Sequence, residues 1–246
     1  MKKICFLGSK KIGSECLQHI FNKKNELDIE ISYVLTNPRG KEIEQFCIQN
    51  GIKILKDLNT LKDSEPFDIG ICVQYEKILK KKHIDKAKEI FINLHMAPLP
   101  EYRGCNQFSF AILNNDDIFG ATIHQLTEQV DGGAIIFENR FKIPKDYWVE
   151  DLYSLTEMKS IELFKNSLPK IISNDFSLIP QNELEKSRNS SFHYRSEIED
   201  IKKIELDWPE EKIKTHIRAT SMPGFSKPYT LIEGQKIFFT KKDDKS

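Results

Sequence analysis

The sequence predicts an α/β fold: a mostly parallel β-sheet with helices on both faces, followed by a small C-terminal helix and β-hairpin appendage. In the first half, short apolar runs typical of buried strands alternate with segments whose apolar residues recur every three or four positions. This alternation makes neighbouring strands parallel and covers both faces of their sheet with crossover helices. Near the C-terminus, two short strand-like runs flank Glu233-Gly234, which is typical of a hairpin turn.

Each element of the first half has its own signal. The apolar run Ile4–Leu7 predicts the first strand, and Ile12, Cys16 and Ile20 have helical spacing. The strict alternation that begins at Ile29 predicts a strand with one buried face. The predicted elements are a strand at 3–8, a helix at 12–24, a strand at 29–35, a helix at 41–50, and strands at 68–73 and 89–95.

The second half predicts a less regular arrangement. We expect a helix at 106–114, strands at 119–127 and 134–143, and a long helix at 149–173. The Ser/Asn-rich residues 181–192 predict a linker. It separates a main domain, residues 1–180, from the appendage, residues 193–246, in which we expect a helix at 209–220 and strands at 228–233 and 236–240.

Composition excludes several classes of protein. Lys and Arg total 37 and Asp and Glu total 37, so the net charge is zero, which argues against a broad nucleic-acid-binding surface. No run approaches the roughly 18–20 apolar residues of a membrane-spanning helix. The cysteines number five, without a C-x-x-C pair, which indicates reduced thiols. We therefore expect a cytoplasmic protein without a nucleic-acid or membrane partner.

The loop Gly8–Ser14 lies between the first strand and the first helix, where open α/β sheets bind ligands. Ser14 stands where a P-loop requires Lys, and the glycines do not fit G-x-G-x-x-G. A glycine-marked turn is the favoured interpretation, and a ligand-binding loop is the alternative.

Asn93 and His95 form a stronger candidate site. They are two residues apart on a predicted strand, so their side chains leave the same face, at the carboxyl end where α/β sheets bind ligands. An amide that donates a hydrogen bond, beside an imidazole that transfers a proton, suits a carbonyl that becomes an oxyanion. A polar strand end with a hydrogen-bonded histidine is the alternative.

Asp131 precedes Gly132-Gly133, and such a sequence by itself indicates only a tight turn. If Asp131 faces His95, its carboxylate would orient the imidazole and stabilise its charged form.

The chain contains six histidines but no H-E-x-x-H motif and no Cys/His cluster at metal-ligand spacing. We therefore expect no metal site. His19, His83, His193 and His216 are expected to be solvated or packed.

Together these residues resemble the signature of the folate-dependent formyltransferase family. The matching motifs are Asn93-x-His95, Pro98-Leu99-Pro100, Tyr102-Arg103-Gly104, Gly120-x-Thr122-x-His124 and Asp131-Gly132-Gly133-Ala134. Their order and spacing match, and the resemblance covers residues 1–180, which implies the Rossmann-like formyltransferase fold and a catalytic domain. Residues 98–112, 191–195, 217–219 and 223–225 resemble the sugar N-formyltransferases.

The resemblance implies an enzyme that transfers the formyl group of N10-formyltetrahydrofolate to a dTDP-linked amino-deoxy sugar. The expected acceptor is dTDP-4-amino-4,6-dideoxyglucose, for O-antigen or other surface polysaccharide synthesis, and the expected assembly is a homodimer. The implied catalytic residues are Asn93, His95 and Asp131. The implied folate-binding residues are Gln74, Tyr75, Lys77, Ile78, Leu79, Thr127, Glu128 and Val130. The implied sugar-nucleotide-binding residues are Tyr102, Arg103, Gln107, Arg195, Arg218 and Tyr229.

Other functions remain open. A methionyl-tRNA formyltransferase would have a basic surface for tRNA, which the charge balance argues against. Three other enzymes are further alternatives: a UDP-amino-sugar formyltransferase, a glycinamide ribonucleotide formyltransferase and a deformylase. A non-catalytic folate- or nucleotide-sugar-binding protein is the alternative from another class. The sequence leaves open the nucleotide base and the position and stereochemistry of the amine.

Overall fold

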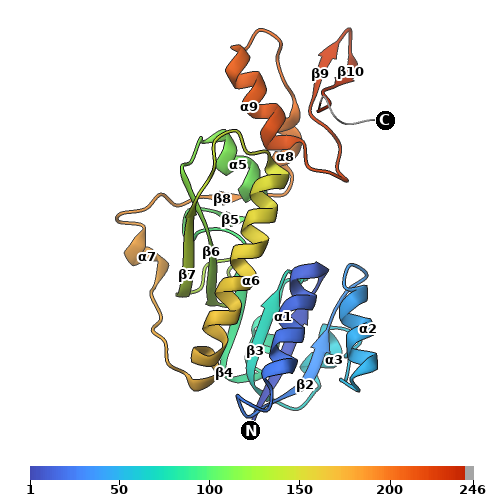
Figure 1. Cartoon of the computed structure of the whole chain (residues 1–246), viewed down its shortest axis with the longest axis vertical. Coiled ribbons are helices and arrows are strands. Elements are labelled where there is room, and N and C mark those ends of the chain that lie inside the picture. Colours follow the sequence, from blue (N-terminus) through green and yellow to red (C-terminus); the bar gives the residue numbers. More distant parts are fainter. Residues whose placement is uncertain (242–246) are drawn as a thin grey trace.

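The centre of the molecule is a six-stranded sheet with the order β2-β1-β3-β4-β6-β7 (Figure 1). The computed structural model describes residues 1–241; residues 242–246, the end of the expected appendage, lie outside the described residues. The sheet strands are β1 (Lys2–Gly8), β2 (Ile29–Leu35), β3 (Phe67–Val73), β4 (Ala87–His95), β6 (Ile118–Gln125) and β7 (Ile135–Lys142). The strands β1 to β4 are parallel, whereas β6 and β7 pair antiparallel. The prediction of a mostly parallel α/β sheet is confirmed.

Alternate residues of the parallel strands enter two separate cores. Ile4 and Phe6 of β1 belong to the larger core, whereas Cys5 and Leu7 belong to the smaller one on the opposite face. The larger core is covered by α1 (Lys10–Lys23), α2 (Lys41–Gln49) and α6 (Val149–Ser173). The smaller core includes residues from the one-turn helices α3 (Leu58–Lys62) and α4 (Lys81–Ile84). The second face is thus covered thinly, which leaves room for a site there.

The C-terminal region packs onto one end of the main domain (Figure 1). It contains α8 (Glu197–Lys202), α9 (Glu210–Thr220), β9 (Tyr229–Ile232) and β10 (Gln235–Phe238), and α9 contacts both α6 and α5 (Gln107–Leu113). The strands β9 and β10 form the expected hairpin. Its turn has φ of 48° at Glu233 and 79° at Gly234, the left-handed pair of a type I′ turn.

Residues 181–192 are not a free linker, and this expectation needs correction. They contain α7 (Gln181–Leu184), and β8 (Phe192–His193) pairs in parallel with β5 (Arg103–Gly104). Gln181 Nε2 also donates hydrogen bonds to the carbonyls of Asp131 and Gly133, at 2.7 and 2.8 Å. Such short polar segments have no periodicity, and their structure depends on partners that are distant in sequence.

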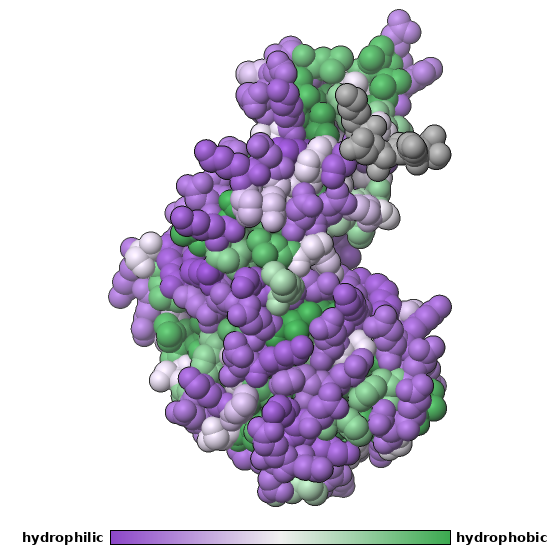
Figure 2. Space-filling view, in the orientation of Figure 1, coloured by the Kyte–Doolittle hydropathy of each residue, from purple (hydrophilic) through white to green (hydrophobic). Residues whose placement is uncertain are grey.

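Hydrophobic side chains remain exposed on the hairpin. Leu231, Ile232, Ile237 and Phe238 are 44–52% exposed, and Figure 2 shows hydrophobic residues at this end of the molecule. Within residues 1–241, each helix is either too short or too polar to cross a bilayer.

Candidate active site

The end of β4 positions the two residues that the sequence singled out. Ile92 and Leu94 point into the larger core, so Asn93 and His95 point to the opposite face. His95 is only 6% exposed. Thr122 Oγ1 donates a 2.8 Å hydrogen bond to the carbonyl of Ala97, which holds the chain just after β4 against β6.

His124 joins this pair from the neighbouring strand. Its Cα is the register partner of Asn93, and the Asn93 Nδ2 amide donates to His124 Nε2 at 3.1 Å. His124 Nδ1 donates to the carbonyl of Gln125 at 2.8 Å, which leaves Nε2 as the acceptor. His124 belongs to the motif Gly120-x-Thr122-x-His124 but was not predicted as a site residue. Its place on a strand beside β4 was the available signal.

Asp131 completes the cluster. Its Oδ1 lies 3.6 Å from both His95 Nδ1 and His124 Nε2, and the Gly104 backbone N–H donates to its Oδ2 at 2.9 Å. Burial would raise the pKa of Asp131, but the imidazole of His95 and this N–H outweigh burial and hold the pKa well below its usual range. Asp131 is therefore a buried carboxylate at neutral pH.

The loop that carries Asp131 depends on a glycine. A Cβ at Gly133 would lie 1.8 Å from the backbone oxygen of Gln125, which is closer than any side chain can approach. Gln125 also donates its N–H to the carbonyl of Ala134, so the chain reverses tightly at this point. The glycine therefore allows Asp131 to return toward His95.

A backbone carbonyl fixes the tautomer of His95. His95 Nε2 lies 2.7 Å from the oxygen of Tyr102, so this nitrogen carries the proton and donates it. In the neutral ring the free lone pair is therefore on Nδ1, the nitrogen that faces Asp131. Protonation at Nδ1 produces an imidazolium beside a carboxylate, a favourable arrangement for a general base.

The residues expected to bind folate lie on two loops that flank this cluster. Residues 74–80 follow β3, and residues 126–134 join β6 to β7. The two loops meet where the Lys81 N–H donates to Glu128 Oε1 at 3.0 Å. Ile78 is 69% and Val130 38% exposed, whereas Leu79 is buried in the smaller core with Tyr75 against it. Thr127 bonds within its own loop, and Lys77 is exposed.

The residues expected to bind the sugar nucleotide do not lie together. Arg195 and Gln107 lie near Asn106, whose Nδ2 donates to the carbonyl of Arg195 at 3.4 Å. Arg103 donates to Glu185 at 2.7 Å. Arg218 donates to the carbonyl of Tyr147, on the side of α9 that faces the start of α6.

The two tyrosines of that set have different surroundings. Tyr229 belongs to the hairpin, where its ring lies 6.2 Å from that of Phe238. Tyr102 is 4% exposed, so its phenol does not point into the open site. Tyr102 contacts the cluster through its backbone oxygen, which accepts a hydrogen bond from His95. Because a backbone atom makes this contact, the type of side chain at position 102 does not predict it.

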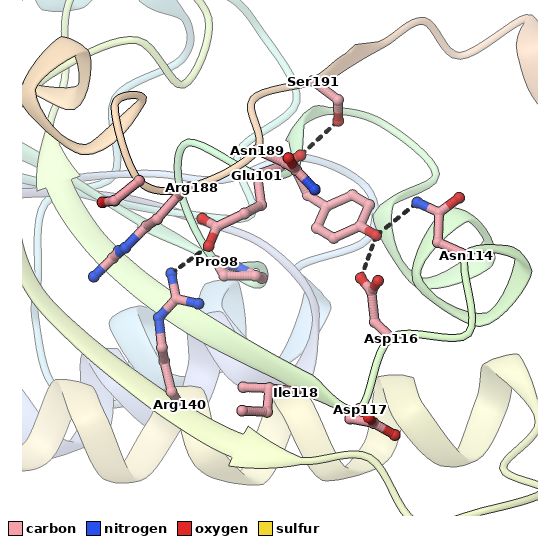
Figure 3. A pocket seen from close by; sticks show the side chains of 12 residues that line it. Pro98, Glu101, Asn114, Asp116, Asp117, Ile118, Arg140, Arg188, Asn189 and Ser191 are labelled. Atoms are coloured by element: carbon pink, nitrogen blue, oxygen red, sulfur yellow. Dashed lines mark hydrogen bonds and ion pairs between the residues drawn. The ribbon is translucent and has the colours of Figure 1, made fainter.

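The phenol of Tyr102 instead lines a cavity of about 770 Å³ that also includes Arg140 and Arg188. In Figure 3, Asn114 and Asp116 point at one hydroxyl group, that of Tyr102, which donates to Asp116 and accepts from Asn114 Nδ2 at 2.9 Å. The backbone oxygen of Tyr102 thus faces His95, whereas its phenol lines the cavity.

One cysteine, Cys72, lies on the strand next to Asn93. Cys72 is the register partner of Asn93, and burial raises its pKa to about 12, which keeps the thiol protonated. Among residues 1–241, no group of three His, Cys, Asp or Glu side chains has an arrangement that could hold a metal ion.

A comparison with known protein families shows the family to which the chain belongs. The family profile described as "Formyl transferase" matches residues 2–168. The protein belongs to the formyl transferase family.

A methionyl-tRNA formyltransferase of Borreliella burgdorferi is 32% identical over 200 residues, which cover 74% of this chain and 62% of that protein. A methionyl-tRNA formyltransferase of Finegoldia magna is 26% identical over 205 residues, covering 78% of this chain and 66% of that protein. The chain thus spans about 62% of the length of the Borreliella relative.

Solved structures of formyl transferases share the whole fold. An N-formyltransferase from Helicobacter canadensis, in complex with folinic acid and dTDP-3-aminofucose, has a TM-score of 0.78 and 26% identity, covering 96% of this chain and 86% of that chain. The sugar 3N-formyl transferase WlaRD, in the presence of dTDP and 5-N-formyl-THF, has a TM-score of 0.79 and 28% identity, covering 96% and 85%. A 4-N formyltransferase from Francisella tularensis, at 22% identity and a TM-score of 0.82 over 98% and 97%, shares the fold.

Proposed function

We propose that the protein transfers the formyl group of N10-formyltetrahydrofolate to the amine of a nucleotide-linked amino sugar. The observation that carries this proposal is the contact of one carboxylate, Asp131, with two imidazoles, His95 and His124, beside the amide of Asn93. Support comes from the two similar proteins whose solved structures contain a formyl-folate together with dTDP or a dTDP-amino sugar.

The two flanking loops suit the proposed donor. Folate would supply the formyl group to be transferred. Ile78 and Val130 expose apolar side chains on loops that meet at Lys81 and Glu128, so a flat, partly apolar ring system bound between them would cover both. The loops also offer backbone N–H and C=O groups for the polar edge of such a ring. Gln74, Tyr75, Leu79 and Thr127 belong to the same two loops.

Three side chains have separate roles in the proposed reaction. His95 Nδ1 accepts the proton of the attacking amine, because Nε2 is already engaged with the carbonyl of Tyr102. Asn93 has a second N–H besides the one it donates to His124, and this N–H stabilises negative charge on the formyl oxygen. Asp131 stabilises the imidazolium at His95. As the tetrahedral intermediate collapses, the bond from the formyl carbon to folate N10 breaks and His95 returns its proton to the departing N10. These residues thus supply a base, an oxyanion donor and a counter-charge without a covalent intermediate.

Within this class, we propose a dTDP-linked acceptor, with dTDP-4-amino-4,6-dideoxyglucose as the first substrate to test. The sugar 3N-formyl transferase among the similar structures makes the 3-amino isomer the direct comparison. We further propose a cytoplasmic homodimer that serves the synthesis of surface polysaccharide.

Methionyl-tRNA formyl transfer is the second candidate function. It is favoured by the 32% identity to the Borreliella enzyme. Against it, the net charge of zero gives no excess of basic residues for tRNA.

Mass spectrometry of the products tests these functions together. The protein is incubated with N10-formyltetrahydrofolate and dTDP-4-amino, dTDP-3-amino and UDP-4-amino sugars, and separately with methionyl-tRNA. We expect one formyl group on a dTDP-amino sugar, and transfer at least about 100-fold slower by a His95→Asn control. Transfer to methionyl-tRNA alone, or folate binding without transfer to any acceptor, would refute the proposal.

A further inference from the structure

Asp131 is held in place by a residue 50 positions later in the sequence, Gln181. Gln181 is the first residue of α7, and its side chain is buried, since the residue is only 5% exposed. Its Nε2 donates hydrogen bonds to the backbone oxygens of Asp131 and Gly133, at 2.7 and 2.8 Å. One amide group thus spans the turn from which the Asp131 side chain reaches His95.

The backbone conformation of Asp131 depends on such contacts. Its φ is 50°, in the left-handed region that a residue with a Cβ rarely adopts. A conformation of this kind persists only where the surrounding structure holds it. The two hydrogen bonds from Gln181 hold the carbonyl of Asp131 itself and the carbonyl two residues later. They therefore fix the direction in which the Asp131 carboxylate leaves the backbone.

The amide of Gln181 is oriented for this contact and not for the pairing of its own oxygen. Its Oε1 is buried and accepts no hydrogen bond from the described residues. Turning the amide over would place Oε1 against two carbonyl oxygens, none of which can donate a hydrogen bond. A buried acceptor without a partner costs free energy, so folding stability alone does not account for this arrangement. The arrangement indicates that Gln181 has a role in positioning the loop.

The segment that carries Gln181 also supports the Asp131 carboxylate. The backbone groups of Ile179 and Ile135 exchange two hydrogen bonds, at 2.8 and 2.9 Å, which anchor the segment just before α7. At the far end of the segment, β8 pairs with β5, and the Gly104 N–H of β5 donates to Asp131 Oδ2 at 2.9 Å. This part of the chain therefore holds the main chain of Asp131 directly and its carboxylate through β5.

The placement of the Asp131 carboxylate is sensitive to small movements. Its Oδ1 lies 3.6 Å from His95 Nδ1 and 3.6 Å from His124 Nε2, so it is the same distance from both rings. A displacement of the loop would lengthen at least one of these contacts. Misplacement of a catalytic group by about 1 Å can lower the rate of an enzyme about 100-fold.

We propose that Gln181 is a positioning residue for formyl transfer, which holds Asp131 at the distance from His95 that the reaction requires. This inference rests on the proposed function. The effect of Gln181 passes through the backbone of residues 131–133, so its loss should lower kcat and leave the KM of either substrate little changed.

Gln181→Met tests the proposal, because methionine has nearly the same length and donates no hydrogen bond. We expect kcat to fall about 10- to 100-fold, with the KM for folate and for the amino sugar little changed. In the Asp131→Asn background, the same substitution should change kcat less than about twofold, because the effect acts through Asp131. Additive effects in this double-mutant cycle, or an unchanged kcat in the folded Gln181→Met variant, would overturn the proposal.

The acid dependence of stability provides a readout that needs no catalysis. Burial raises the pKa of Asp131, but the His95 imidazole and the Gly104 N–H hold it below its usual range, so the carboxylate adds stability that is lost as the pH falls. If the carboxylate moves away from His95, its pKa is lowered less and less stability is lost in acid. In urea unfolding between about pH 5 and pH 2, we expect Gln181→Met to at least about halve the acid loss that separates wild type from Asp131→Asn.

Thr156→Val is the matched control for the loss of a buried hydrogen bond. Thr156 is fully buried on α6, and its Oγ1 donates to the carbonyl of Leu152 at 2.6 Å. Because α6 covers the larger core, on the face opposite to His95, this variant should lose stability without a change in kcat or in acid dependence. Gln181→Asn, whose amide is one methylene shorter, provides the same tests if Gln181→Met does not fold. Circular dichroism verifies that each variant is folded.

The two readouts separate this inference from the proposed function. A wild-type protein that formylates no amino sugar would refute the function, and a reduced acid dependence in Gln181→Met would still support the positioning of Asp131. Formyl transfer by wild type, together with acid curves of wild type and Gln181→Met that are parallel, would support the function and overturn the positioning role.

Discussion

His95 donates its Nε2 proton to the backbone oxygen of Tyr102, at 2.7 Å, and faces Asp131 with its other nitrogen. The main chain of one residue thus selects the tautomer of another. The arrangement leaves Nδ1 as the basic atom of His95, next to a carboxylate that stabilises its protonated form.

Replacing His95 by Asn removes this base while keeping a hydrogen-bonding side chain of similar shape. We expect kcat to fall at least about 100-fold, because general-base catalysis contributes that much. Folinic acid affinity should remain within a few fold of wild type. Single-turnover formyl transfer measures the effect, and near-normal turnover would remove His95 from the mechanism.

Replacing His124 by Leu removes the acceptor that holds the Asn93 amide at 3.1 Å. We expect kcat to fall about 10- to 100-fold, because a misdirected amide stabilises developing charge poorly. His124→Gln, which retains an acceptor, should recover part of the rate. If the Leu variant matches wild type, or the Gln variant is no better than Leu, the proposed role of His124 is wrong.

Asp131 makes folding depend on pH. Its pKa in the folded protein lies below the usual aspartate value, so the folded state binds fewer protons than the unfolded state. The stability that this carboxylate contributes is complete above about pH 5 and is lost as the pH falls through the folded pKa. We expect wild type to lose about 2 kcal/mol more unfolding free energy than Asp131→Asn between about pH 5 and pH 2. Urea unfolding at several pH values measures this difference, and parallel pH curves would contradict the prediction.

Replacing Tyr102 by Phe leaves Asp116 and Asn114 without their phenol partner. We expect the free energy of unfolding to fall by about 1–3 kcal/mol, because partly buried polar groups lose a hydrogen bond. Tyr194→Phe is the matched control, since Tyr194 is 66% exposed. Denaturant unfolding compares the two variants, and equal losses would show that the Tyr102 hydroxyl adds no stability.

The exposed face of the hairpin predicts an interface between two copies of the chain. Ile237 and Phe238 are 48% and 52% exposed, and burying such side chains in a dimer is favourable. We expect Ile237→Asp to shift a wild-type dimer toward monomer in light scattering. Ile48→Asp, at a 70% exposed position on α2, should leave the dimer intact. A monomeric wild type, or a dimer that resists Ile237→Asp, would rule out this interface.

Most of the regular elements could be predicted from local pattern. The periodicity of Ile12, Cys16 and Ile20 predicts α1, and the structure has a helix at Lys10–Lys23. The short elements α3, α4 and α7 were not predicted, because a helix of one turn is too short to show a period.

The candidate site was predicted in part. The two-residue spacing of Asn93 and His95 indicates a shared face of β4, which the structure confirms. The inclusion of His124 depends on the pairing of β4 with β6, a register that neither strand specifies alone. Tyr102 and Tyr229 are expected to contact a substrate, which stays a prediction; the phenol of Tyr102 lines the cavity that includes Arg140, and Tyr229 lies in the hairpin.

The sequence by itself determined the α/β class, the order of the main elements, and the residue types at the end of β4, because these depend on local periodicity and spacing. Only the tertiary structure decided which distant residues meet. Gln181 braces Asp131 from 50 positions away, and Asn106 holds the carbonyl of Arg195 from 89 positions away. Such contacts arise because the folded chain satisfies polar groups with whatever partners packing brings near, and that choice is not encoded in any single segment.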